Sequence, residues 1–537
     1  MKHIEIPLVS ERDRVYRWYE RLPGMLSWLT LFFPIILSLI SPTLAAYFII
    51  AYLLIWAVKA LALNIRIVQG YRRLNQHMSY EWLKLIDELN NPDKAFRRYE
   101  QGISPKWHAK NLVAMQARPA ADRLDYDDLL NAVIIAVYNE SRDIIEPTIR
   151  SILKTDYNHK KMIVLIAYEE RGGPEVEATV QALAAEFRHH FHAFEAVKHP
   201  KDLPNEVIGK GGNITYAGRY LKTMLDAQQV PYKNVIVTTL DADNRPHPQY
   251  FAAVTYAYIA CPDPVRTSFQ PVSMFTNNIW DVPAPMRVIA TGNSFWNIVL
   301  ALRPHMIRNF ASHSQSMETL IDTDFWSVRT IVEDGHQFWR TYFRYDGVHE
   351  VVPILVPIYQ DAVLASSYVK TLKAQFIQVR RWAWGASDIA YVLQKGWRTK
   401  NTIPKWDLFF KTARLIEGHV SWATASLILL LGAFVPLYLA PQASMSLIAN
   451  QLPIIASRIQ TFAMVGLFVG IYFSIRLLPP KPPRYKMRHR VYMLLQWVYL
   501  PVTTIVYSGL AALVAQTRLL FGRYLGKFDV TEKAVKK

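Results

Sequence analysis

The fold is decided by the stretch VIVTTLDADNRPHP, residues 235–248. Its first six residues are mostly β-branched and apolar, which is typical of a buried β-strand. The strand leads into two carboxylates, Asp241 and Asp243. Their spacing lets both face one hard cation such as Mg²⁺ or Mn²⁺, which keeps coordination places open for phosphate oxygens. Because Asp-x-Asp also occurs by chance in turns and helix caps, the preceding strand makes the pair informative.

Two earlier apolar runs also end in polar residues. Residues 132–137 lead into Tyr138-Asn139-Glu140, and residues 162–167 lead into Tyr168-Glu169-Glu170. Helical patterns over 146–154 and 176–187 separate these runs, so we expect buried parallel strands in an α/β sheet. In such a sheet the ligand lies beyond the carboxyl ends of the strands, so the polar groups should meet in one pocket.

Two more motifs carry groups that suit phosphate. The glycine-rich loop Gly209-Lys210-Gly211-Gly212-Asn213 lacks the spacing of an ATPase phosphate loop, yet Lys210 and the flexible backbone suit a nucleotide or diphosphate. Far downstream, Gln378-Val379-Arg380-Arg381-Trp382 offers an amide, a guanidinium and an indole for gripping pyrophosphate and a sugar. The alternative for this second motif is an interfacial helix with Arg and Trp at the lipid headgroup level.

Apolar segments flank this middle region. Residues 25–63 form two stretches separated by Ser41-Pro42-Thr43, and each can cross the membrane as a helix of a tight hairpin. A secretory signal peptide is disfavoured because no small-residue cleavage site stands out. Residues 418–440 and 454–478 give two more candidate spans. Residues 491–515 form a further apolar stretch, which is either a fifth crossing or, if Pro501 breaks it, a re-entrant or interfacial hairpin; a fifth crossing would export the basic tail.

Charge fixes the expected orientation. The chain carries 61 Lys and Arg against 43 Asp and Glu, a formal charge of +18. Basic residues follow the second span and fill the loop 476–490, which the positive-inside rule assigns to the cytoplasm. We therefore expect a multi-pass plasma-membrane protein with a cytoplasmic middle domain. Attraction to an anionic leaflet explains the basic excess without nucleic acid. The single cysteine, Cys261, excludes an intrachain disulfide and a cysteine-rich zinc site.

The motifs together resemble the family 2 glycosyltransferases, particularly the membrane synthases of cellulose, chitin and hyaluronan. The resemblance covers residues 131–385, and its motifs occur in family order. They are Ala136-Val137-Tyr138-Asn139-Glu140, Lys210-Gly211-Gly212-Asn213, Leu240-Asp241-Ala242-Asp243, Val332-Glu333-Asp334 and Gln378 to Trp382. The resemblance implies an α/β GT-A domain with a Rossmann-like mixed sheet between transmembrane helices. It also implies a nucleotide-diphosphate sugar donor, a divalent metal and inversion at the anomeric carbon.

The resemblance also implies roles for individual residues. It implies that the nucleoside is bound by Tyr138, Glu140, Glu169 and Glu170, and the donor diphosphate by Lys210, Asp241, Gln378 and Arg381. It implies that Mg²⁺ or Mn²⁺ is held by Asp241 and Asp243. Asp334 would be the catalytic base with Glu333 beside it, and Trp382 would contact the acceptor sugar. Taken alone, the Glu333-Asp334 pair would read as the acidic start of a helix. Residues 270–333 do not clearly match the synthases, and acceptor identity would reside there.

These observations predict an order of segments. They are a cytoplasmic N-terminal segment (1–24), a transmembrane hairpin (25–63), a helical linker (64–130), the catalytic domain (131–400), an interfacial helix (401–417), transmembrane helices (418–515) and a basic tail (516–537). The expected activity is inverting transfer from a UDP-sugar or similar donor to a glycan or lipid. Processive polysaccharide synthesis with export is slightly favoured over single transfer to a lipid-linked acceptor. A partner subunit or homo-oligomer would help to enclose a channel, and a non-catalytic glycan-binding scaffold is the alternative of a different class.

Overall fold

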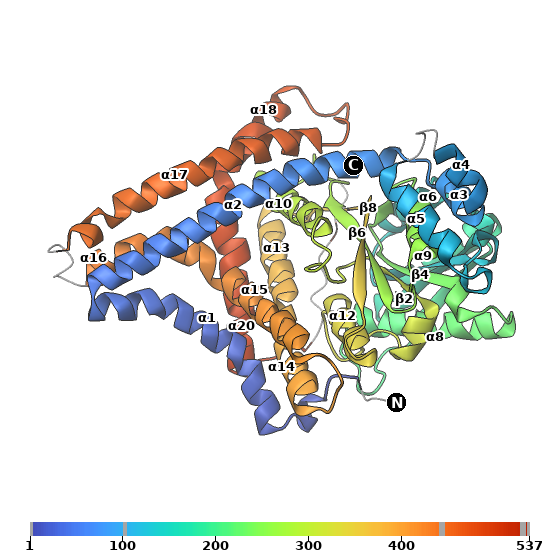
Figure 1. Ribbon diagram of the computed structural model, residues 1–537, viewed down its shortest axis with the longest axis horizontal. Helices are drawn as coiled ribbons and strands as arrows, with labels where there is room; N and C mark the ends of the chain where they lie inside the picture. The colour runs from blue at the N-terminus through green and yellow to red at the C-terminus, as the bar shows by residue number, and fades with distance from the viewer. Residues whose placement is uncertain (1–3, 100–104, 440–445, 527–532, 534–537) are drawn as a thin grey trace.

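The protein divides into an α/β domain and a group of long apolar helices, which lie at opposite ends of the molecule (Figure 1). The computed structural model describes residues 4–99, 105–439, 446–526 and 533. In the expected basic tail, residues 527–532 and 534–537 therefore lie outside the described residues, and so does Ala440 at the end of one expected span.

The α/β domain is built on one eight-stranded mixed sheet. The strand order is β3-β2-β1-β4-β7-β6-β8-β5. Neighbours from β3 to β4 are parallel, β7 runs antiparallel to β4 and β6, and β8 is parallel to β6. The strands are β1 (Leu130–Val137), β2 (Met162–Glu169), β3 (Ala193–His199), β4 (Val235–Asp241), β5 (Arg245–Pro246), β6 (Thr267–Phe275), β7 (Ser314–Ser316) and β8 (Glu350–Gln360).

Helices cover both faces of this sheet, which explains why the central strands β1 and β2 are apolar along nearly their whole length. Val133 and Ile135 of β1 pack in one core with α6, α7 and α9, whereas Ala132 and Ile134 pack in another with α8 and α11. The expected α/β domain with a mixed sheet is confirmed. The helices of this domain are α3 (Trp82–Asn90), α4 (Pro92–Tyr99), α5 (Lys106–Ala117), α6 (Arg142–Leu153), α7 (Pro174–Phe187), α8 (Lys210–Ala227), α9 (Tyr250–Ala260), α10 (Ala284–Ala301), α11 (Met317–Asp322), α12 (Glu333–Arg344), α13 (Tyr368–Ala383) and α14 (Asp388–Leu393).

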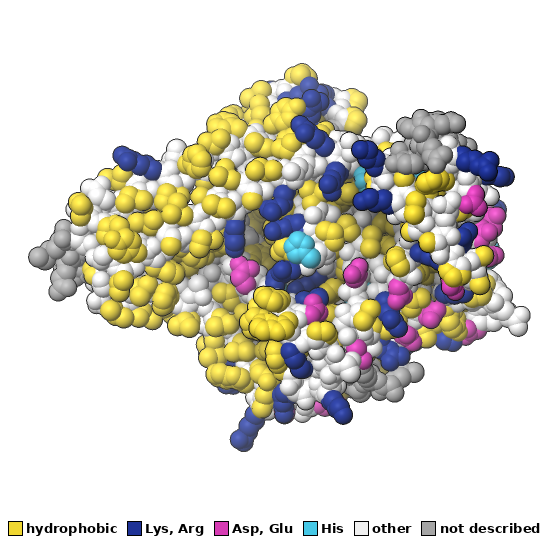
Figure 2. All heavy atoms as spheres, in the orientation of Figure 1, with side chains coloured by type: hydrophobic (Ala, Val, Ile, Leu, Met, Phe, Trp, Pro, Cys, Tyr) yellow, Lys and Arg dark blue, Asp and Glu magenta, His cyan; other side chains and the backbone are white. Residues whose placement is uncertain are grey.

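The long apolar helices extend away from the sheet. Among the described residues, five helical runs are long and apolar enough to cross a membrane. Hydrophobic side chains cover much of this end of the molecule, whereas most acidic side chains in the same view lie on the α/β domain (Figure 2). The runs are α1 (Arg14–Ile40), α2 (Pro42–Ser79), α15 with α16 (Lys405–Leu439), α17 (Leu447–Arg476) and Arg488–Leu520.

The turns at the far end of these helices meet one another. Ser41 accepts a hydrogen bond from the Leu44 backbone at the start of α2, where Pro42 occupies the first turn, as the expected hairpin requires. Thr43 in turn lies 2.8 Å, hydroxyl to hydroxyl, from Ser446 just before α17. The α1–α2 turn and the start of α17 therefore lie together, remote from the sheet (Figure 1).

The last apolar run differs from the others in its flanks, because one flank contacts the α/β domain and the other contacts the start of α1. It comprises α18 (Arg488–Leu495), α19 (Leu500–Val502), a π-helical stretch (Thr503–Leu510) and α20 (Ala511–Leu520). Before it, Arg484 pairs with Asp281 of the α/β domain at 2.6 Å. After it, Tyr524 donates to Glu20 near the start of α1 at 2.7 Å. In Figure 1 the run passes between the α/β domain and the other apolar helices.

Candidate functional site

Polar side chains gather at the carboxyl ends of β1, β2 and β4, where α8 begins. Asn213 in the first turn of α8 donates from Nδ2 to the carbonyl oxygens of Val137 and Ala167, at 3.2 and 2.8 Å. This amide fixes the start of α8 over the ends of β1 and β2. Lys210, the first residue of the helix, is thereby placed beside the end of β4.

The glycines after Lys210 allow close packing. A Cβ atom on Gly211 would lie 2.2 Å from the carbonyl oxygen of Ser327 and 3.3 Å from Cβ of Glu333. No side chain fits there without moving the backbone that leads into α12. The glycine-rich loop therefore brings the start of α8 against the start of α12, which carries Glu333 and Asp334.

Lys210 and Asp241 form the centre of the site. The Lys210 ammonium lies 2.7 Å from Oδ1 of Asp241 at the end of β4. Although burial opposes its ionisation, the charge of Lys210, followed by those of Lys533 and Arg381, lowers the pKa of Asp241. Burial also disfavours the charged form of Lys210, but its pKa is raised by Asp241 and then by Glu333 and Asp334. Residues from five distant segments therefore share one electrostatic environment.

Glu333 and Asp334 occupy different surroundings. The Glu333 side chain is buried, and burial together with the nearby charge of Asp334 raises its pKa to about 8. Asp334 is half-buried. Its Oδ2 accepts a hydrogen bond from the Ala311 backbone at 2.6 Å, and its Oδ1 accepts one from the Gly335 backbone at 2.7 Å. These two donors orient the Asp334 carboxylate.

The loop that holds Asp334 is strained. Ala311 has φ of 41°, in the left-handed region that a non-glycine residue rarely adopts. The loop is anchored beside β4 because the Thr239 backbone donates to the carbonyl oxygen of His313 at 3.1 Å. Strain of this kind persists only where the surroundings fix the backbone, and here it aims the Ala311 N–H at Asp334.

A lysine from the C-terminal end enters the same site. The Lys533 ammonium lies 3.0 Å from Oδ1 of Asp243 and 3.9 Å from Oε1 of Glu140, and Lys533 forms a β-bridge with Leu364. Asp361, after β8, donates its backbone N–H to Oδ2 of Asp243 at 3.3 Å. Burial and the charge of Asp243 raise the pKa of Asp361 to about 7. Positive charge nearby therefore stabilises the cluster formed by Glu140, Asp243 and Asp361.

The donor groups suit a hard divalent cation. Carboxylate oxygens of Asp241 and Asp243 are the ligand type that Mg²⁺ and Mn²⁺ take, and the Lys533 ammonium shows that positive charge is favoured beside Asp243. Within the described ranges, no group of three or more His, Cys, Asp or Glu side chains is arranged to hold a metal. The residues that would hold such an ion are Asp241 and Asp243.

Helix α13 brings the downstream motif to this site. The charge of Arg381 is close enough to lower the pKa of Asp241. Gln378 accepts a hydrogen bond from Gln375 at 3.2 Å. The Trp382 ring lies 6.1 Å from that of Phe275 at the end of β6. Two residues beyond Phe275, Asn277 donates to the Asp243 carbonyl oxygen at 2.9 Å, so the segment at the end of β6 contacts both Trp382 and Asp243.

The four residues expected to bind the nucleoside do not all lie in the same place. Glu140 accepts from the Tyr138 backbone at 2.8 Å and lies near Lys533. Glu169, by contrast, is buried between Arg171 and His199, at 2.8 and 3.2 Å. Glu170 accepts from the Lys201 backbone at 3.0 Å, toward the β3 edge of the sheet. Glu169 and Glu170 therefore hold neighbouring loops, and no contact joins them to the Lys210–Asp241 pair in the described part of the chain.

The sequence did not identify three residues of this site. Ala311, Asp361 and Lys533 lie in segments without a recognisable motif, and each reaches the site through a contact with Asp334 or Asp243. The positive φ of Ala311 has no sequence signature, because alanine is not a residue that predicts it. Lys533 is one of several lysines in the basic tail, and composition alone does not single it out.

Comparisons with known proteins found similar structures but no similar sequences. Neither the protein-family models nor the curated proteins gave a match. Among solved structures, a mannosyltransferase from Pyrobaculum calidifontis in complex with GDP-Man and Mn²⁺ matches with 15% identity and a TM-score of 0.38, over 88% of this chain and 100% of that chain. The TarS 1-349 fragment of S. aureus in complex with UDP matches with 12% identity and a TM-score of 0.35, over 63% and 90% respectively. At these TM-scores the likeness is coarse, and the function is inferred below from the side chains of the site.

Proposed function

We propose that this protein is a membrane-integrated, inverting glycosyltransferase of the family 2 type, which moves a sugar from a nucleotide-diphosphate sugar to a hydroxyl of a glycan or lipid. The observation that carries the proposal is the convergence of Lys210, Arg381 and Lys533 on Asp241 and Asp243. This set of charges lies beyond the carboxyl ends of parallel strands, where open α/β sheets bind their ligands. A UDP-sugar is the donor that we expect.

The cations of the site match a diphosphate. Arg381 can hold a diphosphate with two parallel hydrogen bonds, and Lys210 can supply a point charge next to it. Gln378, one turn before Arg381 on α13, would add an amide. Mg²⁺ or Mn²⁺ held by Asp241 and Asp243 would neutralise charge on the diphosphate when bound. We assign Tyr138 and Glu140 to the nucleoside, and we keep Glu169 and Glu170 as candidates at the outer end of that pocket.

Asp334 is our candidate for the catalytic base. Its carboxylate is partly accessible, whereas the Glu333 side chain is buried and is protonated at neutral pH by virtue of its raised pKa. In the proposed step the acceptor oxygen attacks the anomeric carbon while the carbon–oxygen bond to the diphosphate breaks. The acceptor proton passes to Asp334, and the single displacement inverts the anomeric configuration. Glu333 would position the start of α12.

Trp382 is our candidate for contacting the acceptor sugar, because an indole offers a flat apolar face. We slightly favour processive polysaccharide synthesis, since α13 leads by way of α14 into the long apolar helix α15. The five long apolar runs among the described residues are few for enclosing a sugar channel, so single transfer to a lipid-linked acceptor is the second candidate. A partner subunit or homo-oligomer would make a channel easier to build. In either case we place the α/β domain in the cytoplasm and the helices in the plasma membrane.

A donor-release assay tests the proposal. Membranes that contain the protein are incubated with radiolabelled UDP- and GDP-sugars, and free nucleoside diphosphate and labelled product are measured with and without a chelator. We expect metal-dependent release together with label in glycolipid or in high-molecular-weight polymer. If no nucleotide sugar is consumed, the enzyme proposal fails and a non-catalytic glycan-binding scaffold is favoured. Turnover that resists chelation would remove the role given to Asp241 and Asp243.

A further inference from the structure

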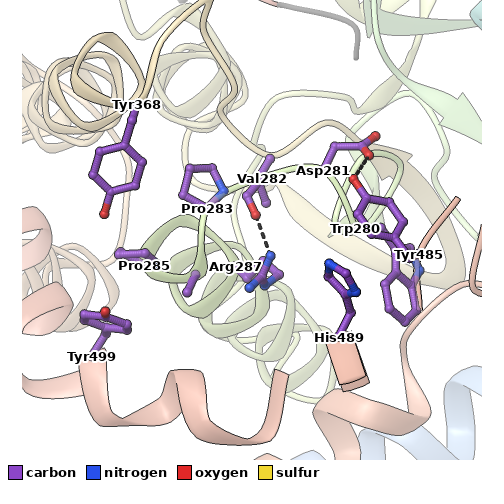
Figure 3. Close-up of a pocket in the computed structure, with 11 residues that line it drawn as sticks. Trp280, Asp281, Val282, Pro283, Pro285, Arg287, Tyr368, Tyr485, His489 and Tyr499 are labelled. Carbon is purple, nitrogen blue, oxygen red and sulfur yellow. Dashed lines mark hydrogen bonds between the residues drawn. The ribbon is translucent and has the colours of Figure 1, made fainter. Parts of the chain in front are cut away.

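A cavity lies where the α/β domain meets the last apolar run. Its volume is about 470 Å³. One wall is the segment before α10 and its first turn, and the other is the loop after α17 together with the start of the last run (Figure 3). The lining includes Trp280, Asp281, Arg287, Tyr485, His489 and Tyr499.

Arg287 gives this cavity its chemical character. Its Nε donates to Oε1 of Gln496 and its Nη1 donates to the Val282 carbonyl oxygen, both at 2.6 Å. Both partners are neutral, and no described carboxylate forms an ion pair with Arg287. A partly buried guanidinium without a counter-charge is costly, and a bound anion would remove that cost. The second terminal nitrogen makes no hydrogen bond to the described residues and can donate to such a ligand.

The one acidic side chain of the lining does not oppose an anion. Oδ1 of Asp281 accepts from Arg484 at 2.6 Å and from the Tyr485 hydroxyl at 2.5 Å, and Figure 3 shows the Asp281–Tyr485 contact at the wall. Its charge is therefore already compensated. The loop 481–490 that forms this wall carries six Lys, Arg or His side chains and no acidic residue. The net charge around the cavity is positive.

Aromatic and apolar side chains distinguish this cavity from a simple phosphate site. Tyr368 and Tyr499 stand at one end of it, and Trp280 and Tyr485 stand at the other (Figure 3). Next to Tyr499, the side chains of Leu495 and Val498 are 65% and 76% exposed. An apolar surface beside a basic, aromatic cavity fits a molecule with a charged head and a hydrocarbon chain.

We infer that this cavity binds the phosphate headgroup of a membrane lipid, with Arg287 on the phosphate and the acyl chain along the exposed face of the last apolar run. Tyr368 and Tyr499 would flank the headgroup. The inference does not depend on the proposed glycosyltransferase activity, because none of these residues belongs to the Lys210–Asp241 pair or its neighbours.

Lipid binding to the full-length protein tests the inference. The purified protein in detergent is titrated with phosphatidylglycerol, with phosphatidylcholine and with inorganic phosphate, and bound lipid is counted by native mass spectrometry. We expect one saturable phosphatidylglycerol site that binds at least about tenfold more tightly than phosphatidylcholine. Arg287→Gln should weaken phosphatidylglycerol binding about tenfold, whereas Arg188→Gln, an exposed arginine of the α/β domain, should not change it.

Tyr368→Ala provides a second variant that does not threaten folding, since this side chain is 56% exposed. It should also weaken phosphatidylglycerol binding, by severalfold. Equal binding of the two lipids, or binding to Arg287→Gln and Tyr368→Ala that equals the wild type, would overturn the inference. Displacement of phosphatidylglycerol by an equal concentration of inorganic phosphate would assign the cavity to a soluble anion and likewise overturn it.

Discussion

At the scale of single residues, Glu333 and Asp334 show how neighbours in sequence acquire different chemistry. Burial and the adjacent charge of Asp334 raise the pKa of Glu333 to about 8. Asp334 is half-buried and receives one backbone N–H on each oxygen. An oriented, partly accessible carboxylate is suited to accept a proton from a substrate, whereas a buried protonated one is suited to hold structure.

The Asp334→Asn variant tests the assignment of the base. Asparagine keeps the shape and can still accept the Ala311 N–H, but it cannot take up a proton. We expect sugar transfer to fall by at least about a hundredfold while donor binding stays unchanged. Asp324→Asn is the matched control, because Asp324 pairs with Arg219 on an exposed surface. Transfer that survives in Asp334→Asn would disprove the assignment.

The raised pKa of Glu333 predicts that the stability of the folded protein depends on pH. The ordinary pKa of this carboxyl is 4.5, and in the folded protein it is about 8. Between these values the folded state binds a proton that the unfolded state has released, so stability falls as pH rises through this window. Glu333→Gln carries no such proton and should lose less stability there. Its melting temperature should exceed that of the wild type near about pH 8 and approach it near about pH 4.

Intrinsic tryptophan fluorescence of the purified protein can follow this difference across the pH range. The exposed Glu175 offers the control Glu175→Gln, which should track the wild type. Parallel melting curves for wild type and Glu333→Gln at all pH values would show that the raised pKa of Glu333 is not linked to folding.

At the scale of elements, the site depends on where β4, α8, α12, α13 and the C-terminal end meet. The first four bring Asp241, Lys210, Asp334 and Arg381 together. The last adds Lys533, whose ammonium stands where a cation bound to Asp243 would place its charge. A divalent cation at Asp243 would therefore compete with Lys533 for the same carboxylate.

Removing the Lys533 side chain should strengthen metal binding to the protein when no nucleotide sugar is bound. In Lys533→Ala a divalent cation can bind Asp243 without displacing an ammonium. The charge of the bound cation would also attract the neighbouring Asp361 carboxylate. We expect the Kd for Mn²⁺ to fall about tenfold, as measured by calorimetry on the full-length protein. Lys201→Ala, at an exposed lysine, should bind Mn²⁺ like the wild type. An unchanged Kd in Lys533→Ala would mean that Asp243 is not a metal ligand.

Much of the element arrangement could be predicted from the sequence. The runs 132–137, 162–167 and 235–240 lie within β1, β2 and β4, because strands buried on both faces need unbroken apolar residues. Helices α6 and α7 were predicted by their periodicity. The resemblance implied that Asp241, Asp334 and Arg381 belong to one site. The contacts of Ala311, Asp361 and Lys533 were not, since each depends on a long-range packing contact that leaves no local pattern.

At the scale of the whole molecule, the N-terminal segment and both flanks of the last apolar run lie on the α/β-domain side of the apolar helices. Glu5 near the N-terminus pairs with Arg340 of α12 at 2.6 Å, and Asp13 pairs with Arg398 at 2.8 Å. The flanks of the last apolar run contact Asp281 and Glu20. We propose that four helices cross the membrane and that the last run lies at its surface.

Cysteine labelling tests this topology. Cys261 is the only cysteine, so a Cys261→Ser background permits single-cysteine variants. We expect Lys486→Cys and Arg523→Cys, on either side of the last run, to react with an impermeant maleimide from the same face of the membrane. Tyr438→Cys, 82% exposed at the far end of α16, should react from the opposite face. Labelling of positions 486 and 523 from opposite faces would establish a fifth crossing.

We propose that charges from distant segments form one nucleotide site. The most direct measurement is the binding of UDP and GDP to the purified full-length protein with Mn²⁺, by calorimetry, in wild type, Lys210→Ala and Arg381→Ala. We predict that the wild type binds at least one of the two nucleotides and that each variant binds it about tenfold more weakly, while Lys201→Ala is unaffected. A wild type that binds neither nucleotide, or variants that bind as tightly as the wild type, would contradict the claim.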